Sequence, residues 1–106
     1  MMSNTFQQIT PEEAKKIMDE EVDYTILDVR TQQEYDDGHI EGAVLIPLPE
    51  VPYAAEIELE DYDQTILVYC RSGVRSKSAG AILVELGYTN VYEFGGILDW
   101  PYDIEQ

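Results

Sequence analysis

The sequence predicts an α/β fold in which helices flank a mainly parallel β-sheet. Short runs rich in β-branched and aromatic residues alternate with helical segments along the 106 residues, and this alternation is typical of parallel sheets. The length is near the commonest domain size, so we expect a single domain over residues 1–106. We find no internal repeat, low-complexity tract or linker.

Two helices in the first half begin with clear capping signals. The segment Thr10–Glu13 contains a capping threonine, a proline in the first turn and a glutamate that completes a capping box, and it predicts a helix to about Glu20. Thr31 and Glu34 form a second capping box for a short helix that ends at Gly38. The β-rich runs predict strands near Phe6–Ile9, at Tyr24–Val29 and at Ala43–Ile46.

The second half contains the clearest helix, predicted over Arg75–Leu86 and ended by Gly87. Its apolar residues fall on one stripe: Ala79, Ile82, Leu83 and Leu86. Three prolines between positions 47 and 52 leave room only for a short helix around Tyr53–Ile57. Strands are expected at Thr65–Tyr69 and Val91–Phe94, followed by a Gly95-Gly96 turn, Trp100 and Pro101.

Composition restricts the classes of partner. The chain carries 22 acidic and 6 basic residues, a net charge of -16, so we expect neither nucleic acid nor a membrane surface as a partner. The acidic surface favours solubility, with a basic partner protein as the alternative. A single cysteine excludes an intrachain disulfide and a multi-cysteine zinc site. No cofactor or metal is predicted.

The chain contains no segment typical of export or membrane insertion. Residues 1–16 lack the apolar core of a signal peptide, and the longest apolar run, Ala43–Leu48, is too short to span a bilayer. A lone cysteine also fits a reducing compartment. We therefore expect a cytoplasmic protein, as a monomer or a weak homodimer.

The loop from Cys70 to Ser76 has the features of a nucleophilic site. It joins a buried strand to a strong helix, at the sheet edge where α/β folds bind ligands. Gly73 permits a backbone conformation that a side chain would block. The loop N–H groups and the helix N-terminus then form an anion cradle, which favours the thiolate form of Cys70.

The charge distribution around this cysteine supports that interpretation. Three of the six basic residues, Arg71, Arg75 and Lys77, lie within seven positions, and no acid occurs between Asp63 and Glu85. This positive island suits a small anionic substrate. The alternative is that Cys70 is a small buried core residue, but that role does not require a glycine, two arginines and two serines directly after it.

The chain resembles the single-domain rhodaneses over nearly its whole length. The matching segments are Leu27-Asp28-Val29-Arg30, Glu34-Tyr35, Gly38-His39-Ile40, Gly42-Ala43, Ile46-Pro47, the CRSGVRS loop at 70–76, and Gly95-Gly96 with Trp100. The resemblance implies a three-layer α/β/α fold around a five-stranded, mainly parallel sheet. It also implies a sulfurtransferase that moves sulfane sulfur from a donor such as thiosulfate to cyanide or a thiol, through a persulfide on Cys70.

The same resemblance assigns roles to the loop residues. The N–H groups of the loop would stabilise the anionic persulfide, and Arg75, with Arg71, would hold the sulfonate end of the donor. The full set of predicted substrate-binding residues is Arg71, Ser72, Gly73, Val74, Arg75 and Ser76. The partners implied are a small anionic sulfur donor and a thiol or protein acceptor.

Three other functions compete with this one. A persulfide carrier or interaction module would use the same loop with little thiosulfate activity. A phosphatase or arsenate reductase of the same fold would have five residues between nucleophile and arginine, whereas four separate Cys70 from Arg75. A second cysteine for disulfide resolution is also missing. A module without catalysis is disfavoured by the intact cysteine.

Several residues outside the loop have two interpretations. Asp28 and Arg30 could order the pocket, but we favour a local surface pair between Arg30 and Glu34 four residues later. His39 could pair with Cys70, but we favour a structural role because the helix terminus alone can lower a cysteine pKa. Ser72 and Ser76 could donate hydroxyl groups to an anion, and Tyr53 and Tyr102 could line the pocket mouth.

Overall fold

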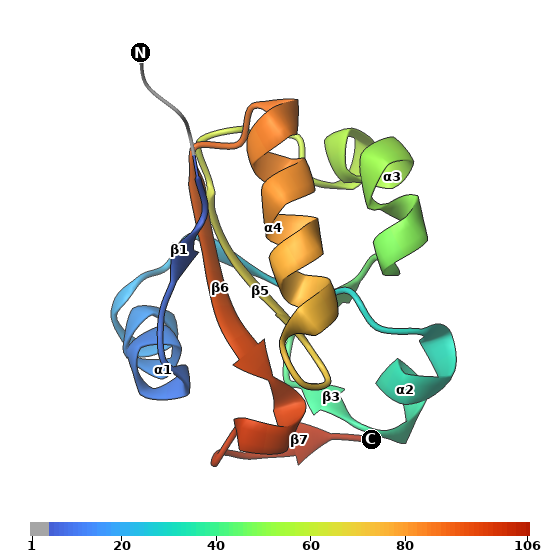
Figure 1. Ribbon diagram of the computed structural model, residues 1–106. Helices are drawn as coiled ribbons and strands as arrows, with labels where there is room; N and C mark the ends of the chain where they lie inside the picture. The colour runs from blue at the N-terminus through green and yellow to red at the C-terminus, as the bar shows by residue number, and fades with distance from the viewer. Residues whose placement is uncertain (1–4) are drawn as a thin grey trace.

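The computed structural model describes residues 5–106 and contains two sheets (Figure 1). The main sheet has five parallel strands in the order β1-β6-β5-β2-β4. Its strands are β1 (Gln7–Gln8), β2 (Tyr24–Asp28), β4 (Val44–Leu45), β5 (Thr65–Cys70) and β6 (Asn90–Gly96). The predicted α/β class and five-stranded parallel sheet are confirmed.

The helices lie on both faces of this sheet, which makes three layers (Figure 1). The α-helices are α1 (Pro11–Glu20), α2 (Gln32–Asp37), α3 (Val51–Glu58) and α4 (Val74–Leu86), and the short 3-10 turns are η1 (Leu48–Glu50) and η2 (Ile97–Asp99). Both predicted capping boxes are present, with Thr10 and Glu13 at α1 and Thr31 and Glu34 at α2. Helix α3 is longer than predicted because Pro52 sits in its first turn, where a missing N–H is tolerated.

The core is divided between the two faces of the sheet. Successive side chains of a strand point to opposite faces, so Val68 and Cys70 of β5 join the core under α3 and α4, while Leu67 and Tyr69 join the core on the side of α1. Residues of α4 such as Ala79 and Leu83 are fully buried against the first face. The cysteine therefore points toward α4, the helix whose first turn follows it in sequence.

The sequence did not predict a second, two-stranded sheet. Strand β3 (His39–Ile40) pairs antiparallel with β7 (Ile104–Glu105), and the Gln106 side chain donates to the Asp37 carbonyl at 3.2 Å. Together these contacts hold the C-terminal segment against α2 (Figure 1). Two-residue strands leave too little pattern for recognition from sequence.

Two sequence expectations concern the ends of the molecule and membranes. Part of the stretch expected to lack a signal peptide, residues 1–4, lies outside the described residues. Within residues 5–106, no helix combines the length and the hydropathy that a bilayer crossing would need.

Candidate active site

Cys70 ends the β-strand at the centre of the main sheet. Strand β5 lies between β6 and β2, and the loop from Arg71 to Gly73 carries the chain directly into α4. The Cys70 side chain is only 1% exposed. A side chain in this position is held on a rigid strand, at the sheet edge where α/β folds place their ligands.

Hydrogen-bond donors converge on the Cys70 sulfur. The Gly73 N–H donates to Sγ at 3.0 Å, and the Ser76 Oγ lies 3.4 Å from Sγ. Burial raises the pKa of the Cys70 thiol. The Ser76 hydroxyl and the N–H groups of Ser76, Gly73 and Ser72 together lower the pKa by more than burial raises it, so the pKa lies below its ordinary value. This lowering of the Cys70 pKa is in the direction that the predicted thiolate requires.

Two glycines of β6 form the base of the loop. The register between β5 and β6 shifts after Val68, so that Cys70 pairs with Gly96. A Cβ on Gly96 would lie 1.9 Å from the Arg71 carbonyl oxygen, and Leu98 N–H donates to that same oxygen at 3.2 Å. Gly73 has a φ of +107°, which a side chain rarely adopts. The predicted Gly95-Gly96 turn is thus the end of β6, packed against the loop.

A buried acid, Glu93, lies next to the loop and was missed by the sequence analysis. Glu93 is 2% exposed, and its Oε2 accepts from the Ser76 Oγ at 2.5 Å and from the Gly95 N–H at 2.8 Å. The position of Glu93 in β6 was the available signal. Residues two apart on a strand point to the same face, so Glu93 shares the buried face of Val91, where an apolar residue is expected.

Arg75 is held by an acidic side chain of another helix. Its guanidinium donates to both carboxylate oxygens of Glu34, at 2.7 and 2.9 Å. Hydrogen bonds from Arg75 are the main reason that the pKa of Glu34 falls to about 2, and the pKa of Arg75 is raised by the same contact. The two predicted anion-binding arginines thus differ: Arg75 is paired with Glu34, whereas the Arg71 side chain is exposed.

The Glu34–Arg75 pair predicts a pH-dependent contribution to stability. Because the pKa of Glu34 is lowered, its stabilising effect is complete above the unfolded-state value of about 4.5 and is lost as pH falls toward about 2. The difference in unfolding free energy between wild type and Glu34→Gln should therefore be constant near neutral pH and shrink below about pH 4.5. Urea unfolding at several pH values measures it, with exposed Glu58→Gln as control. A difference that grows in acid would contradict the pairing.

The predicted surface pair between Arg30 and Glu34 is wrong. Arg30 is 4% exposed, and its Nη2 donates to Asp28 at 2.7 Å and to the Gly38 carbonyl at 2.6 Å. Asp28, fully buried, also accepts from the Tyr69 hydroxyl at 2.7 Å. Local spacing favoured Glu34, but the turn of the chain after β2 brings Arg30 back onto Asp28. Asp28 and Arg30 thus form a buried network that connects β2 and β5 through Tyr69, on the face of the sheet opposite to Cys70.

His39 and Tyr102 contact groups other than the Cys70 loop. The His39 ring stacks on Tyr35 at 3.8 Å between ring centroids, and its nitrogens face the Tyr35 carbonyl and Glu105. These contacts fit the structural role that we favoured for His39. Tyr102 packs edge-on against Trp100, with 4.9 Å between centroids.

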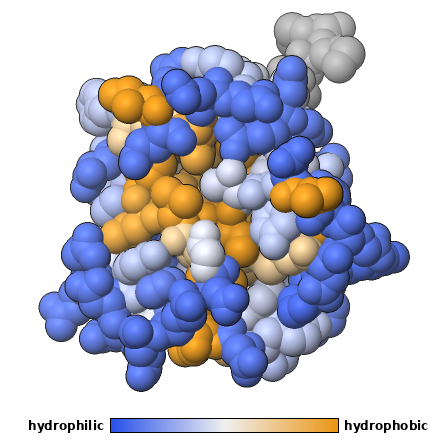
Figure 2. All heavy atoms as spheres, turned by 180° about the vertical axis from the view of Figure 1, so that it is seen from behind, coloured by the Kyte–Doolittle hydropathy of each residue, from blue (hydrophilic) through white to orange (hydrophobic). Residues whose placement is uncertain are grey.

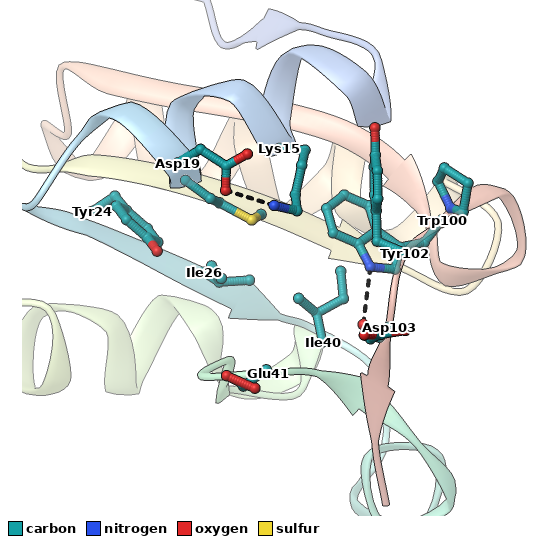
Figure 3. Close-up of a pocket in the computed structure, with 11 residues that line it drawn as sticks. Lys15, Asp19, Tyr24, Ile26, Ile40, Glu41, Trp100, Tyr102 and Asp103 are labelled. Carbon is teal, nitrogen blue, oxygen red and sulfur yellow. Dashed lines mark hydrogen bonds and ion pairs between the residues drawn. The ribbon is translucent and has the colours of Figure 1, made fainter.

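Tyr102 and Trp100 line a hollow of about 420 Å³ on the α1 side of the sheet (Figure 3). Lys15 and Asp19 of α1 pair with each other on one wall. An apolar area ringed by hydrophilic residues is visible on the back of the molecule (Figure 2). None of residues 70–76 lines this hollow, so it is separate from the candidate active site.

The fold and the site together define a class of protein: a three-layer α/β domain with a buried cysteine in a loop whose N–H groups donate to its sulfur. The model of the family described as Rhodanese-like domain matches residues 10–101. The protein therefore belongs to the rhodanese-like family, as its resemblance implied.

Individual relatives agree with this assignment. The chain is 41% identical over 73 residues to thiosulfate sulfurtransferase PspE of Escherichia coli, covering 69% of this chain and 70% of PspE. A structure titled "rhodanese with anions from E. coli" has a TM-score of 0.74 and 36% identity, covering 78% of this chain and 98% of that one.

A second group of relatives is longer than this chain. The tRNA uridine(34) hydroxylase of Photorhabdus laumondii is 31% identical over 103 residues, which cover 92% of this chain but 29% of the hydroxylase. This chain thus corresponds to less than a third of that relative. The family and the similarity to a sulfurtransferase are established, while the particular sulfur donor and acceptor are not fixed by these matches.

Proposed function

We propose that the protein is a cytoplasmic sulfurtransferase that uses thiosulfate as donor and a thiol or cyanide as acceptor. The observation that carries this proposal is the hydrogen bonding of the Cys70 sulfur, with the Gly73 N–H at 3.0 Å in a loop that favours the thiolate. The name of the Escherichia coli relative supports thiosulfate as donor. The acidic chain fits a protein that acts alone or as a weak homodimer, without nucleic acid or membrane.

The reaction has two sulfur-transfer steps. In the first, the Cys70 thiolate attacks the outer sulfur of thiosulfate. A bond forms between Cys70 and that sulfur, the sulfur–sulfur bond of the donor breaks, and sulfite leaves with the electron pair. In the second, the acceptor attacks the outer sulfur of the persulfide. Thiocyanate or a new persulfide leaves, and the Cys70 thiolate is restored.

The loop residues have separate roles in this proposal. The N–H groups between Arg71 and Ser76 stabilise the negative charge of the thiolate and of the persulfide. Arg71 is exposed and meets the sulfonate end of the donor. Arg75 contributes to the same end when its pair with Glu34 opens or is shared with the donor.

A persulfide carrier for partner proteins is the second candidate. Two large apolar side chains beside the loop favour it, because Val74 is 73% exposed and Leu98, whose N–H is bonded to Arg71, is 60% exposed. Exposed apolar residues next to a reactive group are typical of docking surfaces. Negligible turnover with thiosulfate, together with a Cys70 persulfide formed from a protein donor, would favour the carrier.

A steady-state assay with thiosulfate and cyanide tests the proposed enzyme. Replacing Cys70 with serine is expected to reduce turnover by roughly 10³-fold or more, because the hydroxyl cannot hold the transferred sulfur. The exposed α4 variant Ser78→Ala serves as the control and is expected to keep wild-type turnover. Equal turnover by wild type and Cys70→Ser would show that Cys70 is not the nucleophile.

A further inference from the structure

The buried carboxylate of Glu93 has no role in the reaction described above. It is 2% exposed and occupies a core position on the α4 face of β6. Within residues 5–106 it forms no ion pair, and its Oε2 accepts two hydrogen bonds, from Ser76 and from the Gly95 N–H. A buried carboxylate without a cation is unfavourable, and here it lies beside a loop that stabilises negative charge on sulfur.

The Ser76 hydroxyl connects this carboxylate to the nucleophile. Ser76 is fully buried, and its Oγ lies 3.4 Å from the Cys70 sulfur. Its possible acceptors also include Glu93 Oε2 at 2.5 Å, the Gly73 carbonyl at 3.1 Å and the Gly95 carbonyl at 3.2 Å. A hydroxyl has one proton to donate, and a charged carboxylate at the shortest distance is the strongest acceptor.

We propose that Glu93 is a positioning residue that holds the Ser76 hydroxyl proton away from the Cys70 sulfur. The Ser76 hydroxyl then stabilises the thiolate less than it would if Glu93 did not accept its proton, and the negative charge of Glu93 further limits the stabilisation of the thiolate. A less stabilised thiolate is the stronger nucleophile. Glu93 thus lowers the fraction of Cys70 present as thiolate but raises the reactivity of each thiolate. The inference deepens the proposed function by naming a residue that sets the reactivity of its nucleophile.

Other charged groups near the sulfur define the background against which Glu93 acts. They are Arg71 in the loop and Arg75 on α4 with its partner Glu34 on α2, whereas Asp28 on β2 and its partner Arg30 lie on the Tyr69 side of the sheet, opposite to the face toward which Cys70 points. Both acids in the ion pairs are matched by an arginine. Glu93 is the carboxylate of this group that instead accepts from a neutral hydroxyl next to Cys70.

The pH dependence of Cys70 alkylation by iodoacetamide tests the proposal. Glu93→Gln keeps an oxygen that accepts from Gly95 and Ser76 but removes the negative charge. The neutral amide is a weaker acceptor, so the Ser76 hydroxyl donates more readily to the Cys70 thiolate. Alkylation should become roughly threefold faster or more on the acid side of the profile. At high pH it should be slower than in wild type, because the more stabilised thiolate is less nucleophilic. The exposed α4 variant Glu85→Gln matches the charge change and should leave the profile unchanged.

A double-mutant comparison separates the hydroxyl from simple charge. In a Ser76→Ala background the acid-side gain from Glu93→Gln should be smaller, because no hydroxyl remains to redirect. A profile identical to wild type, a shift to higher pH, or an equal gain in both backgrounds would overturn the proposal. Alkylation involves no sulfur transfer, so these results are independent of whether thiosulfate is the donor.

A second substitution at position 93 keeps the proposal testable if Glu93→Gln does not fold. Circular dichroism of Glu93→Gln establishes that the variant is folded before its profile is compared. If it is not folded, Glu93→Asp is used, since its shorter side chain keeps the charge but withdraws the carboxylate from Ser76. The acid-side gain is expected there too, and a wild-type profile in folded Glu93→Asp would overturn the proposal.

Discussion

Replacing Asp28 with alanine is expected to lower the free energy of unfolding by about 3–5 kcal/mol, because it leaves a buried arginine without its counter-ion. Asp28 is fully buried, and Arg30 donates to it from Nε and Nη2 at 3.0 and 2.7 Å. The Tyr69 hydroxyl, which accepts from the Ile40 N–H, would also lose its acceptor. Equilibrium urea unfolding measures the change.

Two controls make the Asp28 prediction specific. Tyr69→Phe removes the two hydrogen bonds of the Tyr69 hydroxyl, to Asp28 and from the Ile40 N–H, but leaves the ion pair, so its effect should be nearer about 1–3 kcal/mol. Replacing Asp28 and Arg30 together with leucine and methionine removes both charges and should be less destabilising than Asp28→Ala. A loss below about 1 kcal/mol in Asp28→Ala would show that this network contributes little to stability.

Replacing Gly96 with alanine is expected to disrupt the Cys70 loop. The new Cβ would lie 1.9 Å from the Arg71 carbonyl oxygen and 2.5 Å from the Ser72 nitrogen, both backbone atoms. The loop would have to move, at a cost above the ~1–3 kcal/mol of ordinary overpacking. The movement would also displace the Gly73 N–H from the sulfur. The free energy of unfolding and the rate of Cys70 alkylation at neutral pH should therefore both fall.

Gly42→Ala provides the matched control for Gly96→Ala. Gly42 has a φ of +83° but no atom within 4 Å of its built Cβ. Its replacement should cost only the ~1–2 kcal/mol of a left-handed residue and leave alkylation unchanged. If Gly96→Ala kept wild-type stability and alkylation, the close packing of β6 against the loop would be contradicted.

The parts of the fold that the sequence predicted correctly are those determined by neighbouring residues. Each capping box depends on two residues three positions apart, and the structure has one at Thr10 and the other at Thr31, as predicted. The stripe along α4 and the run from Thr65 similarly carry their own periodicity. The cysteine loop could be placed because it is the short connection between those two strong elements.

The features that escaped prediction depend on residues distant in the sequence. Arg75 meets Glu34 from 41 positions away, and Ser76 meets Glu93 from 17 positions away. Spacing rules describe only neighbours on one helix or strand, so they favoured an Arg30–Glu34 pair that the fold does not form. The contribution of Glu93 to the site became visible only when β6 was placed beside the loop.

The mass of the intact protein after incubation with thiosulfate tests the central claim most directly. The claim is that a loop of backbone N–H groups holds Cys70 as a thiolate that accepts sulfur. Wild type should gain one sulfur atom, located on Cys70 and removed by cyanide, whereas Cys70→Ser should gain none. An unchanged wild-type mass, or an added sulfur that persists in Cys70→Ser, would contradict the account.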